Sequence, residues 1–242
     1  LKQIFTLDFG NSFTYQMPVS ELLASRFPVT LALTLMSTVI SLVISLPLGY
    51  FAGVHKDRLG DQVVRTTSLV AISMPSFWVG LLLMIVFALK LKWLPAGGWS
   101  DTLLGQFRCL ILPAVTQSLM TSALLLRNTR NSVVDITRMD YVDFARSKGI
   151  PSGEVRTRHV MRNAMISTVT LLSMRMAAML GGSVIIETVF SVPGIGKLAS
   201  DAIFGRDYAV VQYVVLLFAV LVLVINLITD ILYSFLDPRV NL

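Results

Sequence analysis

Five apolar segments, each long enough to cross a lipid bilayer, limit what this chain can fold into more than any other feature. A membrane-spanning helix needs about 20 mainly apolar residues to cross roughly 30 Å of hydrocarbon. The segments cover residues 28–54, 68–89, 109–126, 164–186 and 208–236. Only 14% of the residues are charged, whereas soluble domains carry about 25%. We therefore expect an all-α polytopic membrane protein with five transmembrane helices in this chain.

The largest group of basic residues lies between the third and fourth segments. Its eight members are Arg127, Arg130, Arg138, Arg146, Lys148, Arg156, Arg158 and Arg162. Cytoplasmic loops of membrane proteins carry an excess of Lys and Arg, so residues 127–163 are expected in the cytoplasm, together with the C-terminus. Residues 1–28 then form an extracytoplasmic segment ahead of one membrane domain at 29–242. The same bias accounts for the net charge of +6 without nucleic-acid binding.

Within this basic stretch the local pattern predicts two short helices joined by a sharp bend. Residues 141–148 form the first helix, with Asp140 as its N-cap, and Gly149 stands where a C-terminal glycine ends a helix. Pro151 follows two residues later, and Ser152 can cap the second helix. Two interpretations fit this pattern: an element that docks onto a partner, or an amphipathic helix that lies at the lipid headgroups.

Shorter features outside the spans complete the expected topology. Residues 187–207 predict a turn at 193–196 followed by a short amphipathic helix, and residues 19–27 predict another short helix before the first span.

Within the first span, Gly49 and Gly53 form a Gly-xxx-Gly pair, which favours close packing of membrane helices.

The basic stretch also resembles a known sequence motif. Asp143-Phe144-Ala145, then Gly149 and the run His-Val-Met-Arg-Asn at 159–163, is similar to the "EAA" loop of permease subunits in binding-protein-dependent ABC importers. Asp stands for the usual Glu, Phe for an Ala and Arg162 for a Pro. Such departures are typical of the dipeptide, oligopeptide and nickel permeases, in which Ala-Arg-Ser-Lys-Gly and Arg-His-x-x-Arg-Asn recur.

Further segments resemble the same branch in order along nearly the whole chain. They are Leu-Asp-Phe-Gly-Asn-Ser at 7–12, Ser-Met-Pro-Ser-Phe-Trp at 73–78, Trp-Leu-Pro-Ala at 93–96, Ile-Leu-Pro-Ala at 111–114, Glu-Thr-Val-Phe-Ser-Val-Pro-Gly-Ile-Gly at 187–196, Arg-Asp-Tyr at 206–208 and Leu-Asp-Pro-Arg at 236–239. Members of the branch start with one more membrane helix ahead of the Asp-Phe-Gly stretch. The resemblance therefore implies that a sixth, N-terminal helix is missing from this sequence.

The resemblance implies a type I ABC importer permease in the bacterial cytoplasmic (inner) membrane. Its partners would be a second homologous permease, two ATP-binding subunits and an extracytoplasmic substrate-binding protein, with membrane lipid around it. The chain has no P-loop: Gly196-Lys197 is followed by Leu198, and Ser191 stands where the first glycine belongs. We expect no cofactor and no enzymatic activity in this chain, with ATP and Mg bound by the partners. The substrate would be a peptide or a similar solute, such as a nickel chelate or a glutathione-like molecule.

By the same resemblance, the cytoplasmic loop docks in a cleft of an ATPase subunit and acts as a lever. Gly149 provides the bend, Ala145 permits close approach, and polar contacts come from charged neighbours. The expected coupling residues are Asp143, Ala145, Arg146, Lys148, Gly149, Arg158, His159 and Asn163.

Arg175 lies about midway through the fourth apolar segment, where a guanidinium group costs several kcal/mol unless it meets water or a partner. It can line the translocation path, facing a substrate carboxylate or a gate. Alternatively, it can form hydrogen bonds with backbone carbonyls or Asn226. Asp230 lies nearer the membrane edge and is expected to snorkel or to cap a loop.

An alternative function is an ion-coupled secondary transporter or channel subunit, with Arg175 and Asp230 as a coupling pair. Such a protein needs no docking loop, and inverted repeats should be detectable, but the sequence contains no evident internal repeat. A third possibility is a structural subunit of a membrane assembly, which would not require Arg175 within a span.

Overall fold

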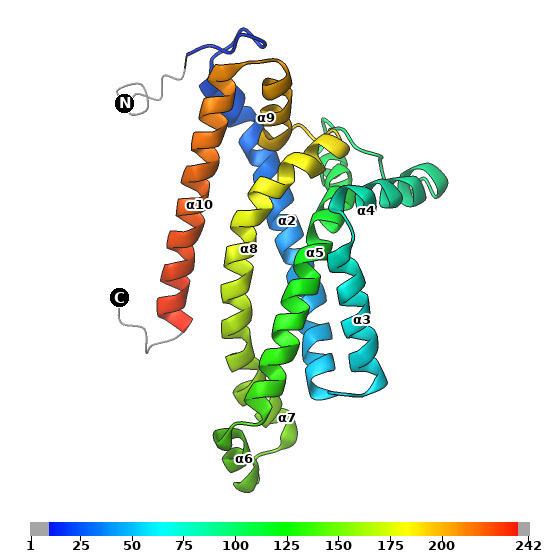
Figure 1. Ribbon diagram of the computed structural model, residues 1–242, viewed down its shortest axis with the longest axis vertical. Coiled ribbons are helices and arrows are strands. Elements are labelled where there is room, and N and C mark those ends of the chain that lie inside the picture. The colour runs from blue at the N-terminus through cyan, green and yellow to red at the C-terminus, as the bar shows by residue number, and fades with distance from the viewer. Residues whose placement is uncertain (1–9, 237–242) are drawn as a thin grey trace. The chain divides into compact units, whose positions relative to one another are not determined.

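The computed structural model describes residues 10–236, and in this part of the chain all regular elements are helices (Figure 1). They are α2 (Val19–Val54), α3 (Leu59–Ser73), α4 (Ser76–Leu83), the π-helix η1 (Met84–Lys90), α5 (Leu103–Thr137), α6 (Asp140–Ser147), α7 (Ser152–Glu154), the π-helix η2 (Val155–Met161), α8 (Arg162–Val189), α9 (Ile195–Phe204) and α10 (Tyr208–Leu236). Four helical stretches in 10–236 are long and apolar enough to cross a membrane, or five if α3 and the α4–η1 stretch form one broken span. The expected all-α polytopic fold is confirmed.

Packing divides the chain into two compact units. The first unit contains Leu1–Ser37, Pro75–Gln117 and Met176–Ile225. The second contains Thr38–Met74, Ser118–Arg175 and Asn226–Leu242. The helices α2, α5, α8 and α10 each contribute residues to both units, so the single membrane domain expected from the sequence has two centres of packing.

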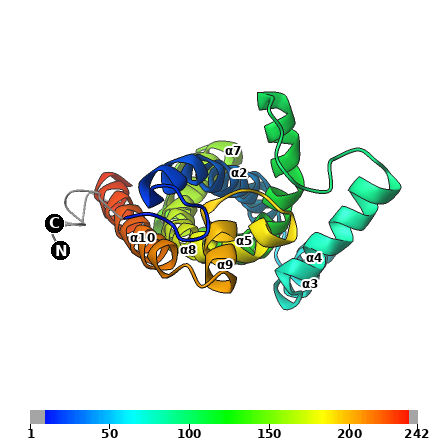
Figure 2. The ribbon, with the colours of Figure 1, turned by 90° about the horizontal axis from the view of Figure 1, so that it is seen from above.

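The core of the first unit joins the start of α2 to α9 and the start of α10. Its buried residues are Val19, Leu22, Leu23, Ile195, Leu198, Ala202, Val210 and Val214. Figure 2 shows α9 beside the start of α10. The predicted short helix is confirmed as α9, which packs between the starts of α2 and α10. The turn predicted at 193–196 lies earlier, because α8 ends at Val189 and α9 already begins at Ile195.

The expectation of a separate helix at 19–27 is wrong, because α2 continues without a break from Val19 to Val54. Proline at position 28 removes one backbone donor but does not end the helix. The first turns of α2 are held by their apolar face, which packs against α9 and α10. This tertiary packing offsets the local cost of the proline.

The second predicted span, 68–89, is not one helix. It is interrupted at Met74, whose backbone is extended (φ −86°, ψ 132°), and α4 begins after Pro75. The ring of a proline clashes with a preceding residue in helical conformation and pushes it into the extended region. The chain continues through α4 into the π-helix η1. Its backbone hydrogen bonds join residues five apart in the chain, whereas those of an α-helix join residues four apart.

The third span is longer than predicted, because α5 runs from Leu103 to Thr137 with Pro113 inside it. The hydropathy of the sequence falls at Arg127, but the helix continues for almost three further turns. Residues 127–137, assigned to the cytoplasmic loop from the sequence, therefore belong to a helix.

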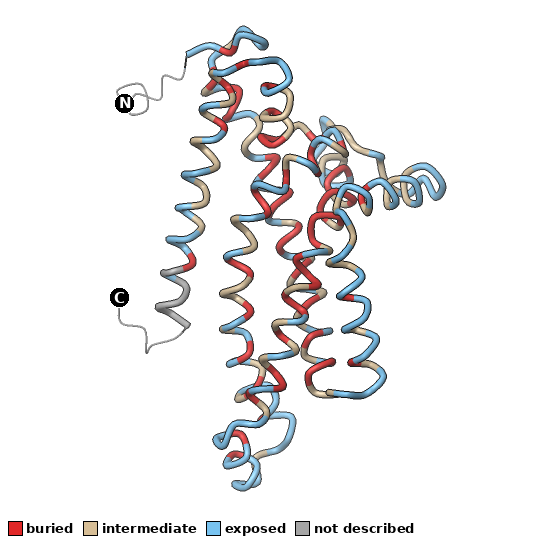
Figure 3. Tube along the Cα trace, viewed as in Figure 1, coloured by how far each residue is buried: buried red, intermediate tan, exposed pale blue. Residues whose placement is uncertain are grey.

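The last helix, α10, has the bounds that the sequence predicts. Figure 3 shows that much of α10 is exposed. Its exposed residues are largely apolar, including Val215, Leu223 and Leu227. Apolar side chains on the outside of a helix are expected for a surface that faces lipid or another membrane helix.

Candidate functional site

The helix α6 ends in a glycine-dependent turn. Gly149 has a φ of +77°, a conformation that residues with a Cβ rarely adopt. Its N–H donates to the carbonyl of Arg146 at 2.9 Å, and the N–H of Ile150 donates to the carbonyl of Ala145 at 3.4 Å. These two bonds form a Schellman motif, which satisfies carbonyls left open at the helix end. The predicted helix end at Gly149 is confirmed.

An apolar cluster holds α6 against three long helices of the second unit. Its buried members are Val133 and Ile136 of α5, Val142 and Ala145 of α6, Val155 and Val160 of η2, and Ala164 of α8. Tyr50 and Val54 of α2 pack against this cluster. Figure 1 shows α6 at the end of α5, next to the start of α8. A displacement of α6 would therefore act on α2, α5 and α8 together.

Ala145 is one of the residues that anchor α6. It is only 5% exposed, and its neighbours in the cluster belong to its own chain. Its small side chain permits a close approach of α6 to the long helices.

The opposite face of α6 is charged and exposed. Arg146 donates to Asp143 at 3.0 Å within the helix, and the ammonium group of Lys148 lies 4.5 Å from the centre of the Phe144 ring. In the next stretch, Arg158 pairs with Glu154 at 3.4 Å. Such exposed ion pairs contribute little to stability, so their charges remain available to a partner.

His159 and Asn163 connect the junction of η2 and α8 to α6. The side-chain amide of Asn163 donates to the backbone carbonyl of His159 at 2.6 Å and to the hydroxyl of Tyr141 at 3.1 Å. The amide thus connects the first turn of α8 to the first turn of α6. His159 takes part through its backbone and not through its imidazole ring.

Two predicted capping residues are placed differently. Met139 occupies the N-cap position of α6, and Asp140 is the first residue within the helix. Pro151 likewise precedes α7, so Ser152 is its first helical residue and forms no side-chain cap. The second short helix is not a separate element, because α7 continues through η2 into α8. The α6–η2 segment, residues 140–161, is therefore continuous with a long membrane helix.

Helices α2 and α5 pack closely in the second unit. A Cβ added to Gly49 would lie 2.8 Å from the Cβ of Thr129, and one added to Gly53 would lie 2.7 Å from the Cβ of Val133. The Gly-xxx-Gly pair thus serves the close packing that it predicts. Thr129 also shares a hydrogen bond of 2.9 Å with Thr168 of α8. The three helices that meet α6 are therefore joined to one another.

A buried ion pair in the second unit was not identified from the sequence. Arg130 of α5 donates to the carboxylate of Asp61 in α3, and the Asp61 side chain is completely buried. The backbone N–H of Asp57 donates to the same carboxylate at 2.9 Å, so the pair also fixes the turn between α2 and α3. The sequence does show Asp61 as an acidic residue among basic ones in an expected loop. It does not show which basic residue pairs with Asp61.

Glu187 is a second buried carboxylate that the sequence analysis did not single out. Its side chain is at the end of α8 and is not exposed at all. The hydroxyl of Thr30 donates to it at 2.7 Å, and the backbone N–H of Lys197 donates at 2.9 Å. Cβ atoms added to Gly194 or Gly196 would meet this carboxylate. Residues 193–196, at the start of α9, therefore pack closely around Glu187.

Asp207 precedes α10 and connects it to the N-terminal segment. Its carboxylate accepts hydrogen bonds from the hydroxyl of Ser12 at 2.5 Å, from the N–H of Thr14 at 3.0 Å and from the N–H of Val210 at 3.3 Å. Burial raises the pKa of this carboxyl, but the hydrogen bonds from Ser12, Thr14 and Val210 outweigh burial and lower the pKa below its ordinary value of 3.8.

Arg175 lies on α8 and is partly exposed. Within residues 10–236 its guanidinium group forms no hydrogen bond or ion pair, and Asn226 is exposed on α10. The side chain of Asp230 and the residues of the 236–239 motif beyond Leu236 lie outside the described part of the chain, as do residues 7–9 of the N-terminal motif.

Comparisons with known proteins place this arrangement in a family. The family model described as "Binding-protein-dependent transport system inner membrane component" matches residues 45–242. A protein of Brucella suis biovar 1 (strain 1330) named as a peptide transport system permease is 38% identical over 244 residues, covering 100% of this chain and 78% of that protein. The glutathione transport system permease protein GsiC of Salmonella choleraesuis (strain SC-B67) is 39% identical, covering 97% of this chain and 75% of that protein.

Solved structures show the same fold at low sequence identity. An inward-facing structure of the MetNI methionine ABC transporter matches with a TM-score of 0.73 and 18% identity, covering 89% of this chain and 96% of that chain. An amino acid ABC transporter with histidines matches with a TM-score of 0.67 and 15% identity, covering 89% of this chain and 94% of that chain.

These findings favour the importer interpretation over the ion-coupled transporter or channel considered as the alternative. The chain belongs to the family of binding-protein-dependent transport system inner membrane components, as a multi-pass permease subunit of an ABC importer.

Proposed function

We propose that this chain forms half of an inward translocation path for a peptide or a related small solute, such as a nickel chelate or a glutathione-like molecule. A second homologous permease forms the other half, and an extracytoplasmic binding protein delivers the solute. Two ATP-binding subunits bind ATP and Mg and hydrolyse the nucleotide. The names of the peptide and glutathione permeases, which are 38% and 39% identical to this chain, support this substrate class.

The observation that carries the proposal is the two-sided character of α6. Val142 and Ala145 anchor one side in the cluster shared with α2, α5 and α8. The other side presents exposed Asp143, Arg146 and Lys148. A helix that only rested at lipid headgroups would direct its apolar side to lipid. In α6 the apolar side chains of Val142 and Ala145 are used within the chain. The exposed side, which carries the charges and also Phe144 (62% exposed), is left for a partner.

The α6–η2 segment docks onto an ATP-binding subunit at the cytoplasmic side, where the C-terminus also lies. Exposed charges steer and orient the two surfaces. Closure of the ATP-binding subunits moves α6, and the movement reaches α8 through the continuous helix and α2 and α5 through the apolar cluster. The bend at Gly149 keeps α6 at an angle to the helix that follows.

Arg175 lines the translocation path in this proposal. An intramembrane guanidinium group without a protein partner requires water or an anionic ligand. The carboxylate of a peptide is such a ligand, and an Arg can bind it through two parallel hydrogen bonds.

Site-specific cross-linking in the complete transporter tests the docking surface. A photo-reactive thiol probe is attached to Lys148→Cys, which is exposed on α6, and as a matched control to Phe204→Cys, which is 85% exposed on α9. We expect a cross-link to the ATP-binding subunit from position 148 and none from position 204. Equal labelling of position 148 by a soluble thiol reagent in the isolated chain and in the assembled transporter would rule out docking at α6.

A further inference from the structure

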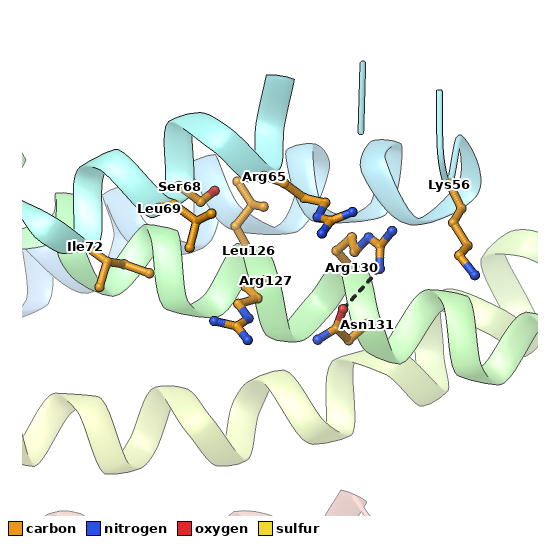
Figure 4. Close-up of a pocket in the computed structure, with 9 residues that line it drawn as sticks. All are labelled: Lys56, Arg65, Ser68, Leu69, Ile72, Leu126, Arg127, Arg130 and Asn131. Atoms are coloured by element: carbon orange, nitrogen blue, oxygen red, sulfur yellow. Dashed lines mark hydrogen bonds between the residues drawn. The ribbon is translucent and has the colours of Figure 1, made fainter. Parts of the chain in front are cut away.

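A cavity of about 340 Å³ lies entirely within the second unit, between α3 and α5 and next to the end of α2 (Figure 4). Cationic side chains line one part of it: Lys56, Arg65, Arg127 and Arg130. None of the described residues that line it is acidic. Its volume falls in the range of about 300–1,000 Å³ that is usual for small-ligand pockets. The proposed transport mechanism uses none of these four residues.

Two of the four cations have no ion pair of their own among the described residues. Arg130 is bound to Asp61, and Lys56 lies 3.8 Å from Asp57. Arg65 and Arg127 have no ion pair or hydrogen bond with any residue in 10–236. Both are exposed, one on α3 and the other on α5. The cavity therefore has an excess of two guanidinium groups, a type of group that binds phosphate oxygens through paired N–H donors.

Apolar side chains line the cavity next to the cations: Leu69, Ile72 and Leu126. Leu69 is 56% exposed on α3, so this part of the lining is open at the surface of the unit. A soluble phosphate would make no use of these three side chains. A phospholipid would, because its headgroup and its acyl chains are joined at the phosphate.

We propose that this cavity binds the phosphate of an anionic phospholipid, with Arg65 and Arg127 on the phosphate and Leu69 and Ile72 along the start of an acyl chain. A net negative headgroup is preferred because a zwitterionic one places its own cation near the two arginines. Basic pockets between membrane helices are known to hold anionic headgroups of this kind. The Asp61–Arg130 pair holds α3 against α5 and thereby forms the walls of the site.

Native mass spectrometry of the purified complete transporter tests the site. The complex is titrated with phosphatidylglycerol and, in a separate arm, with phosphatidylcholine. The test variant is Arg65→Gln with Arg127→Gln, and the matched control is Arg58→Gln with Arg138→Gln, which removes the same charge at exposed positions that do not line the cavity. We expect the test variant to bind phosphatidylglycerol about tenfold to thirtyfold more weakly, and the control to bind like the wild type.

Two further arms separate the source of the phosphate and guard against a folding defect. Leu69→Ser should weaken the binding of phosphatidylglycerol, and inorganic phosphate should not displace the lipid. The variant Arg65→Lys with Arg127→Lys keeps the charge and should recover part of the affinity in an assembled complex. Unchanged lipid binding by the glutamine variant would overturn the proposal. Displacement of the lipid by inorganic phosphate would also overturn it. So would a glutamine variant that loses the second permease from the complex but still binds the lipid with wild-type affinity.

Discussion

Arg130 binds Asp61, 69 positions earlier in the chain, through two nitrogen atoms. Its Nε lies 3.0 Å from Oδ1 and its Nη2 lies 2.6 Å from Oδ2. The Asp61 side chain is completely buried, and that of Arg130 is only 12% exposed. Removal of one partner from such a pair leaves an uncompensated charge away from water.

The first prediction follows from this pair. Replacing Asp61 by Asn should destabilise the protein by about 3–5 kcal/mol, because the Arg130 charge loses its counterion inside the unit. The control is Asp57→Asn, whose side chain is 71% exposed and should matter little. Thermal unfolding of the detergent-solubilised complex measures both variants. Equal unfolding temperatures for the two would show that the pair carries no net stability.

The second prediction concerns Gly149. Replacing it by Val should strongly reduce uptake while the transporter still assembles, because a β-branched residue is strained at a φ of +77° and the end of α6 must change. No atom lies within 4 Å of an added Cβ, so the effect arises from the backbone and not from crowding. Gly149→Asn is the control, since Asn tolerates the left-handed region. Normal uptake by the Val variant would contradict the lever role.

The third prediction concerns Gly194, whose backbone (φ −96°, ψ −175°) is open to any residue. An added Cβ would nevertheless collide with the Glu187 carboxylate. Gly194→Ala should therefore lower stability by about 1–3 kcal/mol, since the buried hydrogen bonds of Glu187 must shift. Gly182→Ala on α8 is the control, with no atom within 4 Å of the new Cβ. If both alanine variants unfold at the same temperature, the turn is not held by Glu187.

The fourth prediction is a pH dependence at Asp207. The folded-state pKa of this carboxyl is lower than its ordinary value of 3.8, so its contribution to stability is fully present above pH 3.8. The contribution is lost as the pH falls from 3.8 toward the lower folded-state pKa. Unfolding temperatures of the wild type and Asp207→Asn should therefore differ most above pH 5 and converge in stronger acid. A constant difference down to low pH would contradict this account.

The fifth prediction concerns Arg175 on α8. Arg175→Ala should reduce uptake and substrate-stimulated ATP hydrolysis about tenfold or more, because a substrate carboxylate loses its charged partner. Arg175→Lys should retain part of both, since the charge remains but the paired donors do not. Met174→Ala, at a neighbouring position that is 66% exposed, is the control. Wild-type values of both activities in Arg175→Ala would exclude Arg175 from the mechanism.

Local features of the fold could be predicted because their causes are local. Hydropathy located the long helices, and α10 has the expected bounds. The end of α6 at Gly149 followed from the conformational freedom of glycine. The break at Met74 was missed although its cause is also local: proline at 75 restricts the residue before it.

The end of α5 was missed for a different reason. Arg130 is charged, so hydropathy placed it in the loop, but its charge is matched by Asp61 on a neighbouring helix. Charge alone does not end a helix when a partner is available, and the partner is visible only in the packed structure.

The amino-acid sequence by itself determined where the apolar helices lie, the bounds of α10 and the end of α6 at Gly149, because hydrophobicity and backbone preference act over a few neighbouring residues. Only the tertiary structure decided which side of α6 is anchored and which charges are neutralised. Asp61 binds Arg130, which lies 69 positions later in the chain. Glu187 accepts a hydrogen bond from Thr30, which lies 157 positions earlier. Such pairs form only when the helices pack against one another. Their strength depends on how far both side chains are buried, and the neighbouring residues in the sequence do not determine this.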